Sequence, residues 1–464
     1  MARPKLEIRH RLRDFLGILL GRSGQSGLRV HLIQGASWSF VLKVTNQALM
    51  FITSIVLARI LGAEGFGLYA FVMGVVGLLG VPANLGLPQL VMRNVASYAA
   101  RADWGPLRGL LTRAHQAMLS VSLGLVIVGI GGLWLFPDRV DPIMLTAFGV
   151  AFLLLPLNAL NMLRSATMRG LGHVITGQIP EFLIKPLSFL ILVGIAYVAL
   201  GPHFSAPWAL GMQVAAVGIA LTVGIVLLLR RMSTNVRVAE PQYDTRAWTR
   251  SALPFLLIGG MQMIIKNTDI VMLGALVGQE SAGVYKVATR GAELVTFVLF
   301  AANRTLGPTI AQLHSLGEYA RLQRLVTRSA RLVFLGSLPI ASVLVALGPW
   351  ILLLFGEDFT IGWTSLCILS TAQLINAGMG SVGLILSMTG FERVTAMGIG
   401  VGAIVNVILN AILVPMWHTE GAAVATGISL VCWNTVLVSQ IFRQLRINPT
   451  VVSGVRKPVS SSQT

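Results

Sequence analysis

The sequence predicts an all-α polytopic membrane protein with about twelve transmembrane helices. Only 11% of its 464 residues are charged, whereas soluble domains carry roughly 25%. Apolar residues make up 55% of the chain, and the mean hydropathy is +0.78. Apolar windows of about 20 residues, the length that crosses a bilayer, recur along the whole chain. So few charges cannot build the surface of a water-soluble domain.

The predicted spans fall into two groups of six, with ends placed to within about four residues. An N-terminal lobe at 34–230 and a C-terminal lobe at 250–442 are joined by a linker at 231–249, and segments 1–33 and 443–464 flank them. The twelve windows are 34–60, 66–92, 115–136, 142–163, 174–200, 207–230, 250–277, 283–303, 331–355, 362–389, 394–415 and 420–442.

Basic residues set the predicted orientation. The net charge of +18 could suggest a nucleic-acid partner, but no polar domain exists to carry a basic stripe. Of the 35 basic residues, 28 fall in the tails and loops of one side and two on the other. Because lysine and arginine concentrate in cytoplasmic loops, both termini are predicted to be cytoplasmic. No nucleic-acid partner is expected, whereas membrane lipids are.

The segments outside the spans leave little room for further domains. The outer loops are short turns, which excludes an outer catalytic or receptor module. In the basic segment 1–33, Leu12, Phe15 and Leu16 form an apolar face that suits an interfacial helix, and a disordered tail fits equally well. Cys367 and Cys432 lie in apolar runs and offer neither a disulfide framework nor a metal-ligand spacing.

A short motif occurs twice, at a constant offset of 216 residues. Its pattern is apolar-G-x-E-x-x-G-apolar-Y, between spans one and two and again between spans seven and eight. The first glycine ends a helix, the glutamate favours the start of the next, and the second glycine allows close helix approach. These tight outer turns predict a duplicated fold and a gate element. The residues are Gly62, Glu64, Gly67, Tyr69, Gly278, Glu280, Gly283 and Tyr285.

Eight ionisable residues fall inside the predicted spans, where each charge costs at least about 2.5 kcal/mol unless it faces a cavity or a partner. Five are basic and three acidic, so the interior is net cationic and suits an anionic substrate such as a pyrophosphate. The predicted substrate-binding residues are Lys43, Lys185, Lys266, Lys286 and Arg290. The candidates for proton or sodium coupling are Asp269, Glu293 and Glu181.

Structural roles compete with these assignments. Glu181 with Lys185, and Lys266 with Asp269, are spaced to pair along one helix. Lys286 is near enough to the outer interface to extend its amine into it.

Three stretches resemble the polysaccharide biosynthesis flippases, the O-antigen and exopolysaccharide (lipopolysaccharide-type) repeat-unit translocases of the MOP exporter superfamily. They are residues 57–69 (LARILGAEGFGLY), residues 86–89 (GLPQ) followed by Arg93, and residues 267–274 (NTDIVMLG) running on to 283–285 (GVY). The resemblance covers about residues 30–445.

This resemblance implies two six-helix lobes around a central cavity, as in MOP and MATE transporters, lined by spans one, two, seven and eight. It implies a flippase rather than an enzyme. The expected substrate is an undecaprenyl-pyrophosphate-linked oligosaccharide in a bacterial inner membrane. A polysaccharide polymerase and glycosyltransferases are the expected partners, with no cofactor or metal apart from a coupling ion.

Three alternatives remain at this point. A peptidoglycan lipid precursor flippase has a similar architecture. A multidrug or cation antiporter of the same superfamily would be expected to have an anionic cavity. A membrane polysaccharide polymerase or ligase would need a larger outer loop for its catalytic groups.

Overall fold

The computed structural model describes residues 28–135 and 141–452, except for the side chains of residues 28–37 and 304. Every regular element within these ranges is helical. The predicted N-terminal segment lies outside the described residues apart from 28–33, which begin helix α2, and so does the tail after residue 452. The all-α fold class is confirmed.

Short breaks separate the helices of the first half. Asp141 starts α5 by accepting a hydrogen bond from Ile143 N at 2.9 Å, with Pro142 at the first helical position. Leu85 and Gly86, both with positive φ, end α2. The elements are α2 (Leu28–Asn84), α3 (Leu87–Arg101), α4 (Trp104–Leu135), α5 (Pro142–Ala151), α6 (Leu154–Gly170), α7 (Val174–Ile179), the π-helix η2 (Pro180–Ile184), α8 (Lys185–Leu200), the 3₁₀ helix η3 (Gly201–His203), α9 (Ala206–Arg231) and α10 (Thr234–Val238).

The second half begins at α11, where the Asp244 side chain accepts a hydrogen bond from Ala247 N at 3.3 Å. Its elements are α11 (Thr245–Leu276), α12 (Gln279–Ser315), α13 (Tyr319–Ala346), α14 (Gly348–Leu353), the 3₁₀ helix η4 (Glu357–Gly362), α15 (Trp363–Met379), α16 (Val382–Met388) and α17 (Glu392–Leu445).

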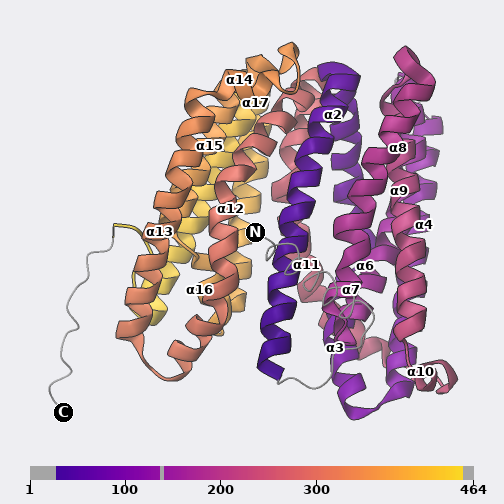
Figure 1. The fold of residues 1–464 in the computed structure, drawn as a ribbon, viewed down its shortest axis with the longest axis vertical. Helices are drawn as coiled ribbons and strands as arrows, with labels where there is room; N and C mark the ends of the chain where they lie inside the picture. The colour runs from indigo at the N-terminus through magenta and orange to yellow at the C-terminus, as the bar shows by residue number, and fades with distance from the viewer. Residues whose placement is uncertain (1–27, 136–140, 453–464) are drawn as a thin grey trace, which may run out of the picture.

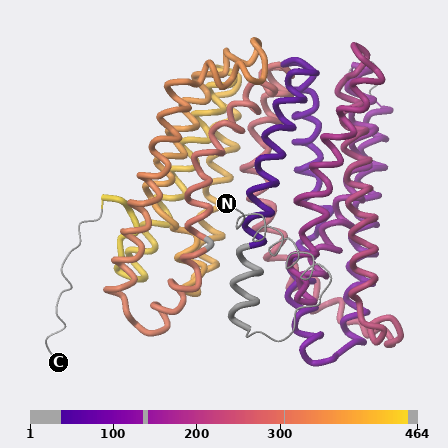
Figure 2. The backbone as a smooth tube through the Cα atoms, viewed as in Figure 1, coloured from indigo at the N-terminus to yellow at the C-terminus, as the bar shows by residue number. Residues whose placement is uncertain are grey.

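The two halves of the chain form two groups of helices (Figure 1). Helices α4, α6, α8 and α9 stand in one group, and α12, α13, α15 and α17 stand in the other. The colours of Figure 2 show the same division, with indigo to magenta on one side and orange to yellow on the other. The end at which α14 lies is the predicted outer end, and the end at which α3 and α10 lie is the predicted cytoplasmic end.

Nine helical segments of the described chain are long and apolar enough to cross a membrane, and counting the bent α12 makes ten. Two of the nine have about twice the length of one crossing, with 47 residues in Trp38–Asn84 and 54 in Glu392–Leu445. Each contains one residue with non-helical backbone, Gly62 (φ 68°) or His418 (φ 47°). A turn at both residues would yield the twelve spans, a number that stays a prediction.

Helix α11 packs against both groups. Near its start, Trp248 and Ala252 lie in an apolar core with residues of α3 and α4, and Trp248 Nε1 donates to Tyr98 OH at 3.2 Å. Near its end, Ile270 and Leu273 lie in a second core with residues of α2, α12 and α17. The two halves are therefore joined along this helix as well as through the linker before it.

The two copies of the repeated motif meet at the α14 end. A Cβ atom at Gly67 would lie 1.7 Å from Gln279 O, and one at Gly283 would lie 2.3 Å from Ala63 O. The backbones of α2 and α12 therefore touch at these glycines, an approach that any side chain would block. The close helix approach expected from the sequence takes place between the two copies.

Replacing Gly67 with alanine is expected to destabilise this contact. The added methyl group would overlap Gln279 O, so α2 and α12 must separate, at a cost of about 1–3 kcal/mol. Thermal unfolding of the purified protein should then show a midpoint several degrees lower. Gly149→Ala is the control, because a Cβ there meets nothing within 4 Å. Equal midpoints for the two variants would contradict the role of the contact.

Arg164 follows the predicted span 142–163 and is one of the 28 basic residues assigned to the loops and tails of one side; its placement in a loop is wrong. It lies in α6, and the residue is 2% exposed. Its Nε and Nη2 donate to Asn161 Oδ1 at 3.1 and 2.9 Å. Gly224 of α9 leaves it room, since a Cβ there would lie 2.3 Å from Nε. The helix extends past its apolar window because these hydrogen bonds satisfy much of the guanidinium inside the protein.

Candidate functional site

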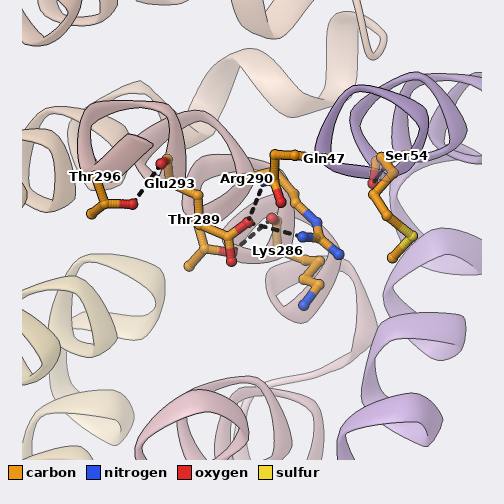
Figure 3. Close-up of polar contacts among 8 residues, drawn as sticks. Gln47, Ser54, Lys286, Thr289, Arg290, Glu293 and Thr296 are labelled. Atoms are coloured by element: carbon orange, nitrogen blue, oxygen red, sulfur yellow. Dashed lines mark hydrogen bonds and ion pairs between the residues drawn. The ribbon is translucent and has the colours of Figure 1, made fainter. Parts of the chain in front are cut away.

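Helix α12 carries a row of charged side chains next to α2 (Figure 3). Lys286, Arg290 and Glu293 follow at intervals of four and three residues and so share one face, as the spacing predicted. Arg290 Nη1 lies 2.9 Å from Glu293 Oε2, and Gln47 Nε2 of α2 donates to the same oxygen at 3.4 Å. Glu293 therefore neutralises Arg290 and links the two halves of the chain.

A cavity of about 310 Å³ lies in the C-terminal half. Lys266 and Asp269 of α11 and Lys286 and Glu293 of α12 line part of it, and α15 and α17 line the rest. Within the described part of the chain, no carboxylate lies at ion-pair distance from Lys266 or Lys286. Of the four spans expected to line a central cavity, spans seven and eight line this one, while spans ten to twelve complete it.

The other two predicted lysines lie in the N-terminal half. Lys43 Nζ is 5.8 Å from the ring centroid of Phe182 and 5.5 Å from that of Phe300, which belongs to α12. Lys185 is half-buried at the start of α8. Neither Lys43 nor Lys185 lines the 310 Å³ cavity. The structure thus groups Lys266 with Lys286.

A π-helical turn explains why Glu181 and Lys185 are not paired. No ion pair joins them in the described structure, and the π-helix η2, which begins at Pro180, contains Glu181 and ends directly before Lys185. A π turn holds more residues than an α turn, so residues four apart no longer lie one above the other. The sequence spacing assumed a regular α-helix here.

Asp269 lies at the centre of a buried hydrogen-bond network and is 4% exposed. Asn410 Nδ2 donates to its Oδ1 at 2.6 Å, and Tyr285 OH donates to its Oδ2 at 2.8 Å. Thr426 Oγ1 hydrogen-bonds to the same Oδ2. These contacts to α12 and α17 take the place of the pairing with Lys266 considered from the sequence. Tyr285 had been assigned to the gate motif, and Thr426 had not been singled out.

Two asparagines of α17 continue this network, since Asn410 Nδ2 also donates to Asn406 O at 2.9 Å. Oδ1 of Asn406 and Oδ1 of Asn410 are buried and have no hydrogen-bond partner among the described residues. Carboxylate, amide and hydroxyl oxygens are the ligands that hard cations prefer. The first half of the chain has no equivalent, because the offset of 216 matches Asp269 with Thr53. The position of the first half that corresponds to Asp269 therefore carries no carboxylate.

Arg59 joins the two halves at the α14 end. From α2, its Nε donates to Leu354 O at 2.7 Å and its Nη2 donates to Leu353 O at 3.3 Å. These carbonyls end α14, where the helix dipole favours a cation. Arg59 is one of the two basic residues counted on the outer side, and the sequence gives no sign of this long-range contact.

The predicted gate residues occupy the same end. Gly62 and Gly278 have φ of 68° and 137° and mark the two turns. Glu64 and Glu280 are exposed. Tyr69 stacks on neighbouring aromatic rings of the first half, at centroid distances of 6.3 and 6.4 Å.

Comparisons of the sequence with known proteins give two family matches. The model described as "Polysaccharide biosynthesis protein" matches residues 32–314, and the MatE model matches residues 254–416. The "Probable low-salt glycan biosynthesis flippase Agl15" of Haloferax volcanii is 22% identical over 401 residues, which are 86% of this chain and 80% of the relative. The "Probable flippase AglR" of the same organism is 24% identical over 61% of this chain and 58% of the relative.

Solved structures share the fold at low sequence identity. An inward-facing multidrug resistance MATE transporter of the MOP superfamily matches with a TM-score of 0.70 and 12% identity, over 88% of this chain and 98% of that chain. The lipid II flippase MurJ in an inward closed conformation matches with a TM-score of 0.61 and 12% identity, over 88% of this chain and 87% of that chain. These likenesses show that the chain shares the fold of these solved transporters.

Proposed function

The chain belongs to the polysaccharide biosynthesis protein family, flippases of the MOP superfamily, and on that premise we propose that it moves an undecaprenyl-pyrophosphate-linked oligosaccharide across a membrane. The oligosaccharide is a repeat unit of O antigen or exopolysaccharide. It passes by alternating access from the cytoplasmic to the periplasmic leaflet of a bacterial inner membrane, with both termini in the cytoplasm. A polymerase and glycosyltransferases are the proposed partners.

The observation that carries this proposal is the pair of lysines in the cavity. Lys266 and Lys286 both line it, and no carboxylate of the described residues pairs with either. Their amines can donate charge-assisted hydrogen bonds to a pyrophosphate. The two carboxylates of the cavity are engaged elsewhere, Glu293 with Arg290 and Asp269 with its hydrogen-bond donors. This arrangement favours an anionic substrate over the cation expected for an antiporter.

Asp269 supports a coupling role for H⁺ or Na⁺. Its carboxylate lines the same cavity and is surrounded by oxygen atoms of α12 and α17. Glu293 is held by Arg290 and Gln47, and Glu181 does not line the cavity, so Asp269 is the strongest of the three candidates. A cation bound at Asp269 neutralises a carboxylate of the cavity and strengthens the attraction of Lys266 and Lys286 for an anion, so release of the cation favours release of the substrate.

Contacts at the α14 end support alternating access. The paired glycines Gly67 and Gly283, together with Arg59, hold the two halves against each other there. Opening of the cavity to the outer side requires these contacts to break, so they serve as the outer gate in the proposed cycle.

Loss of the gene in its native host tests the assignment. The expected result is accumulation of lipid-linked repeat units that face the cytoplasm, with loss of the surface polysaccharide. Accumulation of unpolymerised units on the periplasmic side would instead indicate the polymerase or ligase alternative. A block in peptidoglycan synthesis with intact surface polysaccharide would indicate a peptidoglycan precursor flippase.

A further inference from the structure

The 310 Å³ cavity has a second wall that carries no charge. Trp433 and Ser429 of α17, Gln373 of α15 and Gln262 of α11 line it. Gln262 precedes Lys266 by four residues on α11, so the two side chains share one helix face. The uncharged wall therefore adjoins the part of the same cavity that Lys266 and Lys286 line.

The packing of α15 against α17 positions this wall. Asn434 Nδ2 donates to Asn376 Oδ1 at 3.0 Å, and Asn376 Nδ2 donates to Gln373 Oε1 at 3.3 Å. Gly402 leaves space for the indole, because a Cβ there would lie 2.9 Å from Trp433 Cβ. Side chains held in this way need little ordering when a ligand binds, which favours affinity.

The wall also contains a hydrogen-bond donor without an acceptor. Trp433 Nε1 is buried and has no hydrogen-bond partner among the described residues. A buried polar group without a partner costs free energy, and such groups are rare in native proteins.

We propose that Gln262, Gln373, Ser429 and Trp433 form a subsite for an uncharged sugar ring, the one bonded directly to the pyrophosphate. Amides both donate and accept hydrogen bonds, as sugar hydroxyls do, and the Ser429 hydroxyl, which donates to Thr426 O at 2.9 Å, can still accept one. The apolar face of a pyranose can pack on an indole ring. A polyprenyl chain cannot hydrogen-bond to amides, whereas a sugar ring can. The inference rests on the proposed function, which places the pyrophosphate on Lys266 and Lys286.

Binding of two lipid probes to the full chain in nanodiscs tests the subsite. One probe is undecaprenyl pyrophosphate, and the other is the same lipid carrying a single glucose, galactose or N-acetylglucosamine. We expect the wild-type protein to prefer at least one sugar-bearing probe. Trp433→Ala should weaken binding of that probe about tenfold and leave the sugar-free lipid unaffected. Trp433→Phe should retain most of the preference, because the phenyl ring still offers an apolar face.

A second subsite variant and a control variant complete the test. Gln373→Leu preserves side-chain size and should also lower affinity for the sugar-bearing probe selectively. This variant still tests the subsite if the Trp433→Ala protein does not fold. Trp417→Ala is the matched control on α17, since this residue is 52% exposed and lies outside the cavity lining.

The outcomes separate the subsite from the proposed function. Equal weakening of both probes by Trp433→Ala and Gln373→Leu would show a structural role and overturn the subsite. Equal wild-type affinity for sugar-bearing and sugar-free lipids would overturn the subsite and leave the flippase proposal standing. Failure of the wild-type protein to bind either lipid would overturn the proposed function and the subsite with it.

Discussion

Replacing Lys266 and Lys286 together with alanine is expected to reduce transport of lipid-linked repeat units about a hundredfold. Both amines line the cavity, and no carboxylate of the described residues offsets their charge. A hydrogen bond to a charged group contributes about 1.5–3 kcal/mol, so loss of two such bonds to a pyrophosphate accounts for the expected reduction. The measurement is surface polysaccharide in the native host, at equal abundance of the membrane protein.

The control for this double variant is Arg324→Ala with Arg328→Ala, which removes two exposed positive charges outside the cavity. It should leave transport close to the wild-type level. Arg290→Ala should have a smaller effect than the lysine pair, because Arg290 is already neutralised by Glu293 at 2.9 Å. Wild-type polysaccharide in cells with the double lysine variant would refute the cationic site.

Replacing Asp269 with asparagine is expected to abolish the response of transport to an ion gradient. Asparagine preserves the shape of the side chain but removes the charge that can bind H⁺ or Na⁺. A potential of 100 mV acting on one charge provides about 2.3 kcal/mol, which corresponds to about a fiftyfold difference in substrate distribution between leaflets. In proteoliposomes under a Na⁺ or H⁺ gradient, the wild-type protein should bring the substrate concentrations of the two leaflets close to this ratio. Asp269→Asn should only make the two concentrations equal.

The ion that drives the wild-type protein identifies the coupling cation. Glu392→Gln is the control, because it removes an exposed carboxylate from the first turn of α17 and should leave the gradient response unchanged. If Asp269→Asn accumulated substrate as well as the wild-type protein does, Asp269 would not be the coupling residue.

Charges inside apolar helices were the part of the site that could be predicted from the sequence. Lys286, Arg290 and Glu293 share a face of α12 because an α-helix repeats every 3.6 residues. The same periodicity misled at Glu181 and Lys185, where the π-helix η2 shifts the register. A local pattern reports side-chain direction only where the helix is regular.

Contacts between residues far apart in the chain could not be inferred from helical periodicity. Asp269 is bound by Asn410 and Thr426, which are 141 and 157 residues away in the chain. Arg164 was assigned to a loop because its charge ended an apolar window, whereas Asn161 and Gly224 accommodate it inside the bundle. Neither environment could be inferred without knowing which helices are neighbours.

The membrane class, the helical fold and the charged face of α12 follow from local composition and periodicity. They do so because the bilayer requires long apolar helices, and buried charge must be confined to a few positions. The contact of Gly67 with Gly283, the partners of Asp269 and the two walls of the cavity depended on how distant helices pack. Each of these sites combines atoms from at least two helices, so only the tertiary structure determines which of them meet.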